Sequence, residues 1–455
     1  MERVRFSFPN EKVAFLWPDH PFVLAGSIVL DEIVSCLDKQ EDVDNISKKI
    51  ATKYGENLAT VRNYVINIRN SIQALEENHI TPDLHNLDGI SMATFNLTKA
   101  CNLNCRHCYA NASPNSAHTS ELSEHEIEYA ISNLDKIVSH QPRLLIFSGG
   151  EPTLKISLLI HAIKCAYDFG FNVRLNTNGI IMPNELIQVL KECNVLTQIS
   201  IDGINEDSHG YLRGNKYSFI KAKETLYQLT QNGCRVRVSM TTHAKNYEEI
   251  PDVFMMAADN GAEQFITSNL VVSGRAQHEG LKPVSLSKEF NVIYNLVKDN
   301  KKYQLMTKST LLAETINAIR AGVKFINCGS GLCTCCVDSD GYMYPCINMI
   351  RDEFQIASIL ENNIKNVWRT SPIIAQLKSI NVDTINKQCA SCVFRYFCGS
   401  YCRGETISAG ENLYSPYIRC SEWKQALIKI LEILSNTPDI YYFNHDAISE
   451  VLMRE

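Results

Sequence analysis

The first 80 residues alternate short apolar runs with turn residues and then change to a helical period. Three strand-like runs, separated by Pro, Asn, Asp and His, cover residues 4–8, 13–17 and 22–26. A helix is expected over 29–37, and a second where Val43, Ile46 and Ile50 recur at helical spacing. Apolar residues then step by three and four from Leu58 to Leu75, which predicts a long amphipathic helix. This order predicts a small winged-helix-like α+β module at residues 1–80.

From residue 90 onward, strand-like and helix-like runs alternate after a linker at 81–90. The strands are expected to end at Thr98, Ser148, Thr177, Asp202, Thr242 and Ser268. Helices are expected between them, over 123–139, 156–169, 184–193, 218–232 and 247–260. Such alternation predicts an α/β fold with a parallel sheet inside and helices outside, and in a barrel of this kind the chemistry lies at the C-terminal strand ends. An amphipathic helix over 422–435 is expected to cover the barrel.

Composition narrows the class of protein. A chain of 455 residues is too long for one ordinary core, so two or three domains are expected. No run approaches the roughly 18 apolar residues that span a bilayer, and the N-terminus lacks a signal-peptide core. These features predict a cytoplasmic protein without a membrane partner. The net charge of −6 argues against nucleic acid as a partner.

The cysteines point to ligation rather than disulfides. There are 17 in the chain, and 12 of them fall in three groups, at 101–108, 328–346 and 389–402, with Cys420 just beyond. The first group has the spacing C-x3-C-x2-C. Three thiolates on one loop can hold three irons of a [4Fe–4S] cube and leave the fourth iron open to a small molecule. The alternative is a helix face of packed cysteines, which the preceding strand-like run and the later Gly-Gly-Glu-Pro turn disfavour.

The stretch Cys101-Asn102-Leu103-Asn104-Cys105-Arg106-His107-Cys108-Tyr109 resembles the cluster loop of radical S-adenosylmethionine (SAM) enzymes. Gly149-Gly150-Glu151-Pro152 resembles the methionine-binding turn of that family. The resemblance implies a partial (β/α)6 TIM-like barrel. It also implies that S-adenosylmethionine chelates the open iron, and that its reductive cleavage yields a 5′-deoxyadenosyl radical.

The same resemblance assigns residues to the cofactor. Cys101, Cys105 and Cys108 become the catalytic cluster ligands, and the glycines allow close backbone approach. Glu151 is expected to receive the ligand ammonium, and Arg213 to pair with the methionine carboxylate unless it is a surface arginine. Gly274-Arg275-Ala276 resembles a segment near the last core strand of the family. The full set of cofactor-binding residues is Tyr109, Ser148, Gly149, Gly150, Glu151, Asn178, Ser200, Asp202 and Arg213.

The C-terminal third carries the other cysteines. Because C-x2-C pairs are a zinc signal, one or two structural zinc sites are an alternative. The full order, with Gly341-x4-Cys346 inside it, resembles the SPASM domain of peptide-modifying radical enzymes, which binds two auxiliary [4Fe–4S] clusters. The resemblance implies one ligand set of Cys328, Cys333, Cys346 and Cys402, and another of Cys389, Cys392, Cys398 and Cys420. Cys333, Cys335 and Cys336 compete for one position, and an open iron for a substrate thiolate, or a spare thiol as hydrogen donor, stays possible.

Residues 1–80 are similar in element order to the PqqD-like precursor-recognition domain of ribosomal peptide (RiPP) maturases. There a leader peptide adds as a strand beside the third strand and against the last helix; a packing or dimerisation domain is the alternative. The predicted domains are therefore 1–80 for leader recognition, 88–300 for the radical SAM core and 301–455 for the SPASM domain. The auxiliary clusters are expected to accept an electron or hold a substrate sulfur. Flavodoxin or ferredoxin is the expected kind of electron donor.

The predicted function is a peptide maturase that forms an oxidative cross-link, a Cys thioether of the sactipeptide or ranthipeptide type. A carbon–carbon cross-link is the second chemistry. A formylglycine-forming sulfatase maturase is another alternative, although such enzymes generally lack a precursor-recognition module. A metal-stabilised peptide-binding scaffold is the non-enzymatic alternative. Three [4Fe–4S] clusters predict about 12 iron atoms per chain, whereas a zinc scaffold predicts almost none.

Overall fold

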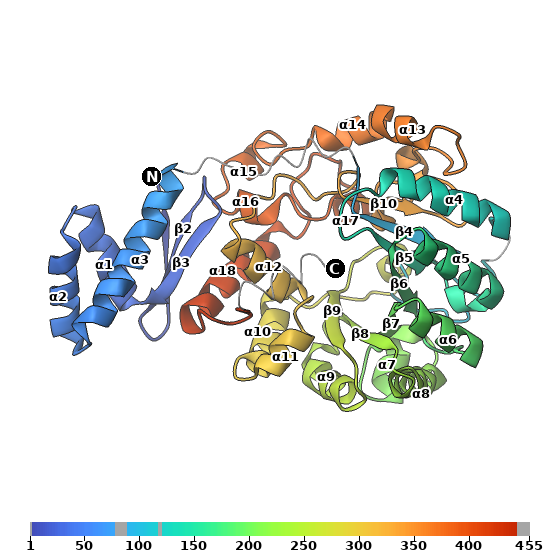
Figure 1. Ribbon diagram of the computed structural model, residues 1–455, viewed down its shortest axis with the longest axis horizontal. Coiled ribbons are helices and arrows are strands. Elements are labelled where there is room, and N and C mark those ends of the chain that lie inside the picture. Colours follow the sequence, from blue (N-terminus) through green and yellow to red (C-terminus); the bar gives the residue numbers. More distant parts are fainter. Residues whose placement is uncertain (1, 78–88, 117–120, 444–455) are drawn as a thin grey trace.

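The computed structural model describes residues 2–77, 89–116 and 121–443. Two sheets organise the chain: a three-stranded sheet in the order β1-β2-β3, and an eight-stranded sheet in the order β11-β10-β4-β5-β6-β7-β8-β9. Figure 1 shows the small sheet in the N-terminal unit at one end of the molecule and the large sheet at the other. Most of the predicted linker at 81–90 lies outside the described residues.

The N-terminal unit has the predicted order of three strands and three helices. The strands are β1 (Val4–Phe8), β2 (Lys12–Trp17) and β3 (Phe22–Ser27), and the helices are α1 (Ile28–Asp38), α2 (Val43–Tyr54) and α3 (Leu58–Glu77). Asp42 caps α2 by accepting from the backbone N–H groups of Asp44 and Asn45, and Gly55 ends it in the left-handed region. Strand alternation directs Val13, Phe15 and Trp17 to the helices, while Ala14 and Leu16 face the rest of the molecule.

The predicted barrel core is confirmed. Six parallel strands follow one another in space as in sequence: β4 (Met92–Asn96), β5 (Leu144–Ser148), β6 (Asn172–Thr177), β7 (Leu196–Ser200), β8 (Arg235–Thr242) and β9 (Gln264–Asn269). The connecting helices are α4 (Glu124–Ile137), α5 (Ile156–Asp168), α6 (Asn184–Glu192), α7 (Glu206–Arg213), α8 (Tyr217–Gln231) and α9 (Ile250–Asp259). Of these, only α7 has no predicted counterpart. A Ser123–Glu126 capping box begins α4.

The sheet continues past the predicted domain boundary at residue 301. Strand β10 (Thr334–Val337) pairs in parallel with β4, and β11 (Met343–Tyr344) pairs antiparallel with β10. The cysteine-rich C-terminal segment therefore shares a sheet with the barrel, next to the strand that leads into the first cysteine group. Neither strand is among the predicted ones.

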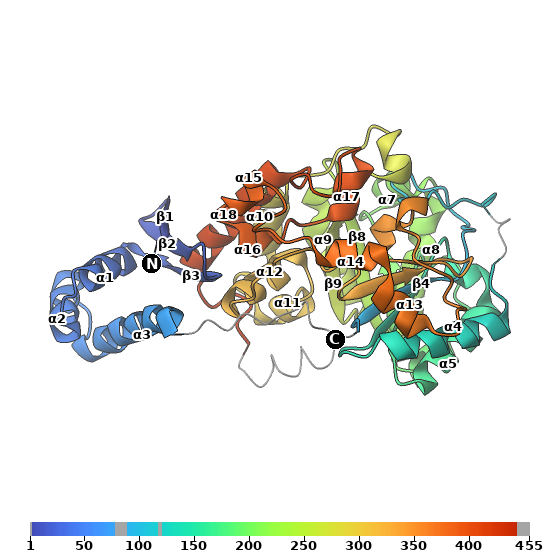
Figure 2. The ribbon, with the colours of Figure 1, turned by 90° about the horizontal axis from the view of Figure 1, so that it is seen from above.

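The remaining helices follow the last barrel strand in the sequence. They are α10 (Leu286–Val297), α11 (Lys301–Met306), α12 (Leu311–Arg320), α13 (Ile364–Thr370), α14 (Pro372–Lys378), α15 (Lys387–Ala390), α16 (Arg395–Cys398), α17 (Arg403–Ser408) and α18 (Cys420–Asn436). Figures 1 and 2 show α18 between the N-terminal sheet and α10. Its residues share a core with Ala14 and Leu16, and Trp423 meets Phe290 of α10 edge-on. The helix packs into the core that contains the barrel, as expected, and its apolar stripe also contacts the N-terminal unit, which was not expected.

No helix in the described part of the chain is long and apolar enough to cross a membrane.

Candidate active site and cluster pockets

The loop after β4 gathers the first three cysteines. Cys101 and Cys105 are buried, and Cys108 is partly exposed. The N–H of Cys108 donates to the carbonyl of Cys105, and the N–H of Leu103 donates to Cys101 Sγ at 3.4 Å. Cys101, Cys105 and Cys108 pack in one small cluster with Leu103 and Ala112. The predicted triplet is therefore brought together at the C-terminal end of a barrel strand, the usual place for chemistry in this kind of fold.

The Gly-Gly turn after β5 lies against this loop. Gly150 N–H donates to the Thr98 carbonyl at 2.7 Å, and Glu151 N–H donates to the Ala100 carbonyl at 2.8 Å. A Cβ atom on Gly149 would stand 2.5 Å from the Thr98 oxygen, and one on Gly150 would stand 2.0 Å from the Ala100 oxygen. The two glycines are needed because the turn touches the backbone just before Cys101.

The Glu151 carboxylate is held by the protein. It is 1% exposed and accepts from the N–H and hydroxyl of Thr153, the hydroxyl of Thr177 and the N–H of Asn178, all within 3.1 Å. Burial raises the pKa of this group, against the effect of these donors. Instead of an open acceptor for a ligand ammonium, the structure shows a carboxylate that fastens the turn to the end of β6.

A buried ion pair lies behind the second cysteine. Arg213 Nε donates to Asp202 Oδ2 at 2.5 Å, and Arg213 Nη1 lies 4.0 Å from Cys105 Sγ. Asp202 also accepts from Thr241 N–H at 2.8 Å. Burial alone would raise the pKa of Asp202, but Arg213 and two neighbouring histidines bring it to about 2. Arg213 is therefore no surface arginine, and its guanidinium lies beside the cluster loop.

His107 lies in the cluster loop but was not among the residues predicted for the site. Its Nε2 lies 4.0 Å from Asp202 Oδ2, and its Nδ1 is buried without a hydrogen-bond partner among the described residues. Burial, followed by the nearby Arg213, lowers the pKa of His107 to about 4. The side chain is thus neutral near pH 7, with one ring nitrogen unsatisfied beside the cysteines.

The other predicted cofactor residues fall around the same rim. Asn178 donates from Nδ2 to Asn102 Oδ1 at 2.7 Å, which ties the end of β6 to the cluster loop. Tyr109 reaches toward Ser148 at the end of β5. Ser200 is the last residue of β7 and is partly buried. The structure brings all the residues predicted for the first site to one edge of the sheet, from four neighbouring strands.

The segment Gly274-Arg275-Ala276 clamps the cluster loop. Arg275 Nε donates to the Cys105 carbonyl at 2.7 Å, its Nη2 donates to the Ala112 carbonyl at 2.8 Å, and its N–H donates to the Cys108 carbonyl. A Cβ on Gly274 would lie 2.4 Å from the Cys108 oxygen. The segment that resembled a strand-end motif of the family therefore contacts the cluster loop directly, although Arg275 and Cys105 are 170 residues apart in the sequence.

We expect Arg275→Ala to release the first cluster selectively. The substitution removes two guanidinium hydrogen bonds that fix the loop, each worth about 1–3 kcal/mol because the donor is charged. After anaerobic loading, iron analysis should show about four iron atoms fewer per chain, while the auxiliary clusters remain. Arg235→Ala is the matched control, because that arginine pairs with Glu263 on the exterior of the barrel. Full iron content in Arg275→Ala would contradict the clamp.

A third buried carboxylate lies beside the start of the cluster loop. Asp338, at the end of β10, accepts from Asn96 Nδ2 at 3.1 Å and pairs with Lys99 Nζ at 2.9 Å. Lys99 also reaches Asp340 at 3.1 Å. The Cys336 sulfur lies 3.9 Å from Asn96 Nδ2. Only the pairing of β10 with β4 brings these groups together, so the sequence pattern could not reveal them.

The first auxiliary ligand set lines a large cavity. Cys328, Cys333, Cys346 and Cys402 face a space of about 690 Å³ between the barrel and the C-terminal segment. Asn348 Nδ2 donates to Cys402 Sγ at 3.6 Å, and Glu405 N–H donates to the same sulfur at 3.3 Å. Burial, followed by the nearby Cys328 thiol, raises the pKa of Cys333, which places Cys333 close to Cys328.

The neighbouring cysteines separate by strand alternation. Cys335 and Cys336 are consecutive in β10, so their side chains point to opposite faces. Cys335 joins the core that contains the barrel, whereas Cys336 joins a small core with Tyr344 and Leu377. Cys333 precedes the strand on the Gly329–Cys333 turn, where its N–H donates to the Gly329 carbonyl. Cys335 also lines the cavity, but Cys333 lies close to Cys328, which favours Cys333 as the fourth ligand.

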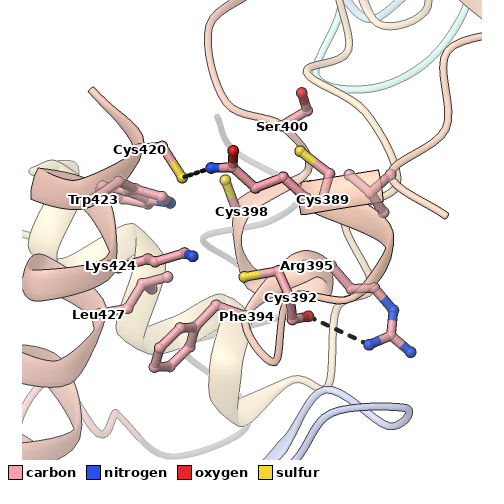
Figure 3. Close-up of a pocket in the computed structure, with 12 residues that line it drawn as sticks. Cys389, Cys392, Phe394, Arg395, Cys398, Ser400, Cys420, Trp423, Lys424 and Leu427 are labelled. Carbon is pink, nitrogen blue, oxygen red and sulfur yellow. Dashed lines mark hydrogen bonds between the residues drawn. The ribbon is translucent and has the colours of Figure 1, made fainter. Parts of the chain in front are cut away.

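The second auxiliary set forms its own pocket. Cys389, Cys392, Cys398 and Cys420 line it together, and Figure 3 shows their sulfur atoms directed toward a common space. Gln388 Nε2 donates to Cys420 Sγ at 3.6 Å. The pocket abuts the N-terminal unit, because Phe394 stacks on Phe6 at 5.7 Å and Arg395 forms an ion pair with Asp19.

The donor sets fit iron–sulfur clusters by their chemistry. Burial raises the pKa of Cys101, Cys398 and Cys402 to about 12, so these thiols ionise only where a positive centre compensates them. N–H donors directed at the sulfurs are the usual surroundings of cluster ligands. Among the described residues, no three His, Cys, Asp or Glu side chains converge closely enough for a single metal ion.

Two family models match the chain. The Radical SAM superfamily covers residues 95–257, and an iron–sulfur cluster-binding domain, SPASM, covers residues 328–393. These ranges contain eight of the eleven predicted cluster ligands; the other three, Cys398, Cys402 and Cys420, lie after residue 393.

The relatives of this chain are named for different activities. The sporulation killing factor maturation protein SkfB of Bacillus subtilis is 29% identical over 68% of this chain and 71% of its own. The mycofactocin maturase MftC of Mycolicibacterium smegmatis is 28% identical over 74% of this chain and 84% of its own. The AdoMet-dependent heme synthase of Methanosarcina barkeri is 25% identical over 70% of this chain and 92% of its own.

Solved structures share the fold. Streptococcus suis SuiB bound to S-adenosylmethionine has a TM-score of 0.60 at 12% identity and covers 91% of this chain and 100% of its own. Native anSMEcpe with bound AdoMet and Cp18Cys peptide has a TM-score of 0.62 at 14% identity and covers 77% of this chain and 100% of its own. At these identities the likeness concerns the architecture.

Proposed function

Since the chain is a radical SAM enzyme with a SPASM iron–sulfur domain, we propose that it matures a ribosomally made peptide by forming an oxidative cross-link, with a Cys thioether as the bond. Relatives named for killing-factor maturation and for mycofactocin maturation support a peptide substrate. The structural observation that best supports a peptide substrate is the cavity of about 690 Å³, which extends from the last barrel strand to the first auxiliary cysteines.

The charge of this cavity favours a peptide over a tetrapyrrole. Its charged lining side chains are Glu289, Glu314, Glu405 and Arg419. Arg419 is already engaged by Glu422 at 2.8 Å and by the Asn269 side chain. A porphyrin with several carboxylates would face a net negative wall, which costs free energy. A neutral or cationic peptide segment suits the wall better, although a heme synthase is among the relatives.

The protein's own residues position and enclose the reaction. Cys101, Cys105 and Cys108 would hold the first cluster, and with S-adenosylmethionine it supplies hydrogen-atom abstraction from an unactivated carbon. Gly149 and Gly150 let the turn lie directly against the cluster loop, while Glu151 fixes the turn and so leaves ammonium recognition to backbone carbonyls. Arg213, held by Asp202, offers its guanidinium to a ligand carboxylate. The walls of the barrel and the C-terminal segment exclude water from the substrate.

The N-terminal unit offers an edge for the leader. Strand β3 ends the small sheet, so the edge away from β2 has no strand partner among the described residues. The hydroxyl of Tyr64 on α3 lies close to Gly26 in this strand. A peptide strand added here would gain backbone hydrogen bonds and lie against α3. The contact of this unit with Phe394 and Arg395 places it beside the auxiliary domain.

The test pairs the chain with the short cysteine-bearing peptide encoded nearest to its gene. We expect anaerobically loaded enzyme, S-adenosylmethionine and a reductant to produce 5′-deoxyadenosine and a peptide that has lost two hydrogen atoms. Fragmentation should place the bond at a cysteine sulfur. Alkylation that still labels every cysteine, together with the same mass loss, would indicate a carbon–carbon bond instead.

Matched variants separate the alternatives. Cys101→Ala should abolish both products, whereas Cys165→Ala, outside every predicted ligand set, should change neither. Oxidation of a substrate cysteine to an aldehyde would indicate formylglycine formation. Decarboxylation of a porphyrin with no change in any peptide would overturn the peptide assignment. Iron without cofactor cleavage would indicate a scaffold.

A further inference from the structure

The first two turns of α18 form one wall of the second auxiliary pocket. Cys420 begins the helix, and Trp423, Lys424 and Leu427 line the pocket together with it. Figure 3 shows the indole nitrogen of Trp423 and the ammonium of Lys424 on the side that faces the sulfur atoms. The wall therefore presents two nitrogen donors in addition to a cysteine.

The indole of Trp423 is held rigidly and has an unsatisfied donor. The residue is 3% exposed, and its ring packs on Tyr401 at 4.5 Å and on Phe290 at 6.4 Å. Its Nε1 is buried and has no acceptor among the described residues. A buried N–H without a partner is rare because it costs free energy. Four cysteine sulfur atoms line the pocket that this N–H faces, together with the oxygens of Ser400 and Gln388, so the sulfurs are its most numerous side-chain acceptors.

Lys424 is a half-buried cation without a protein anion. Within the described ranges it makes no ion pair or hydrogen bond, whereas Lys429 on the same helix pairs with Glu432 at 3.1 Å. The charged residues that line the pocket are Lys424 and Arg395, and no described lining residue is a carboxylate. Arg395 already engages Asp19 and Asp383. Among the residues that line the pocket, Lys424 is thus the cation left for whatever negative charge the pocket holds; the buried Arg403 lies near Cys389 and Cys398 but outside the lining.

We propose that Trp423 and Lys424 raise the reduction potential of the auxiliary cluster that Cys389, Cys392, Cys398 and Cys420 would bind. The proposal rests on the cluster assignment of the proposed function. Hydrogen bonds to sulfur and nearby positive charge favour the more negative, reduced form of a cluster. Residues that make no contact with substrate would in this way decide how readily this cluster takes up an electron.

The experiment is a redox titration of the full chain, loaded anaerobically with iron and sulfide and followed by electron paramagnetic resonance. Cys420→Ser identifies the signal of this pocket, because a ligand change alters only that spectrum. Lys424→Met should lower the ratio of reduced to oxidised cluster about tenfold at a fixed potential, which corresponds to about 59 mV for one electron. Trp423→Phe, which keeps the ring and removes the N–H, should lower it about threefold.

Controls make the outcome specific. Lys424→Arg keeps the charge and should stay near wild type, and Lys429→Met should leave all midpoints unchanged. Unchanged midpoints in Lys424→Met and Trp423→Phe at full iron content would overturn the proposal. If Trp423→Phe loses iron, Lys424→Met decides alone, because its side chain already reaches solvent. Zinc in this pocket would also overturn it. The titration needs neither peptide nor S-adenosylmethionine, so it fails independently of peptide maturation.

Discussion

Gly150→Ala is expected to abolish cleavage of S-adenosylmethionine while the chain still folds. The added Cβ would lie 2.0 Å from the Ala100 oxygen and 2.6 Å from its carbonyl carbon. Ala100 precedes Cys101, whose N–H is bound to the Ser113 carbonyl, so the loop cannot retreat without moving a cluster ligand. Because a displacement of about 1 Å can cost about 100-fold in rate, we expect at least that loss. The measurement is 5′-deoxyadenosine formed per minute by anaerobically loaded enzyme.

Gly26→Ala is the matched control for this prediction. Neither Gly26 nor Gly150 has a positive φ, but a Cβ on Gly26 would meet its nearest neighbours at an ordinary 3.5 Å. Because Gly26 lies in the strand proposed to bind the leader, both variants are assayed without peptide; there the control should cleave the cofactor at the wild-type rate and bind the same amount of iron. A wild-type rate in Gly150→Ala would show that the turn and the cluster loop are not in the close contact described.

The motifs of the first site could be predicted from the sequence because their chemistry is local. Cys101, Cys105 and Cys108 lie within eight residues, and the Gly149–Gly150 turn follows a strand whose apolar pattern is plain. The spacing of apolar residues likewise sufficed to predict strands β1 to β9 and most helices between them. A half-buried strand repeats every two residues, whereas an amphipathic helix repeats every three to four. Parallel order then places the strand ends at one edge, and the structure has them there.

The remainder depends on contacts between distant segments. Nothing in a single sequence shows that β10 pairs with β4, so the contact of Asp338 with Lys99 could not be predicted. Alternation along β10 directs Cys335 and Cys336 to opposite faces, which the sequence shows only once this segment is known to be a strand. Glu151 looks like a free carboxylate in the motif, but its donors come from Thr177 and Asn178 on the next strand. An amphipathic stripe such as that of α18 reveals that a face is buried, not which unit covers it.

Asp202→Asn is expected to be the most destabilising single substitution in the first site. The Asp202 side chain is fully buried and that of Arg213 is 11% exposed, so the substitution leaves a guanidinium without its counter-charge in the interior. Breaking a buried pair in this way costs about 3–5 kcal/mol. The measurement is the free energy of unfolding in urea, with iron retention followed in parallel. Asp207→Asn breaks a pair with Lys216 at the surface and should cost less than about 1 kcal/mol.

A double substitution distinguishes stability from ligand binding at this pair. If Arg213 serves only to neutralise Asp202, Asp202→Asn combined with Arg213→Gln should recover part of the lost stability, with a coupling energy of about 0.5–3 kcal/mol. If the guanidinium also binds the methionine carboxylate, the double variant should regain stability but still bind S-adenosylmethionine at least about tenfold more weakly. Arg213→Lys sharpens the result, because it keeps the charge and loses the planar fork. If the stable double variant bound S-adenosylmethionine with wild-type affinity, Arg213 would not be a cofactor-binding residue and would serve only as the ion-pair partner of Asp202.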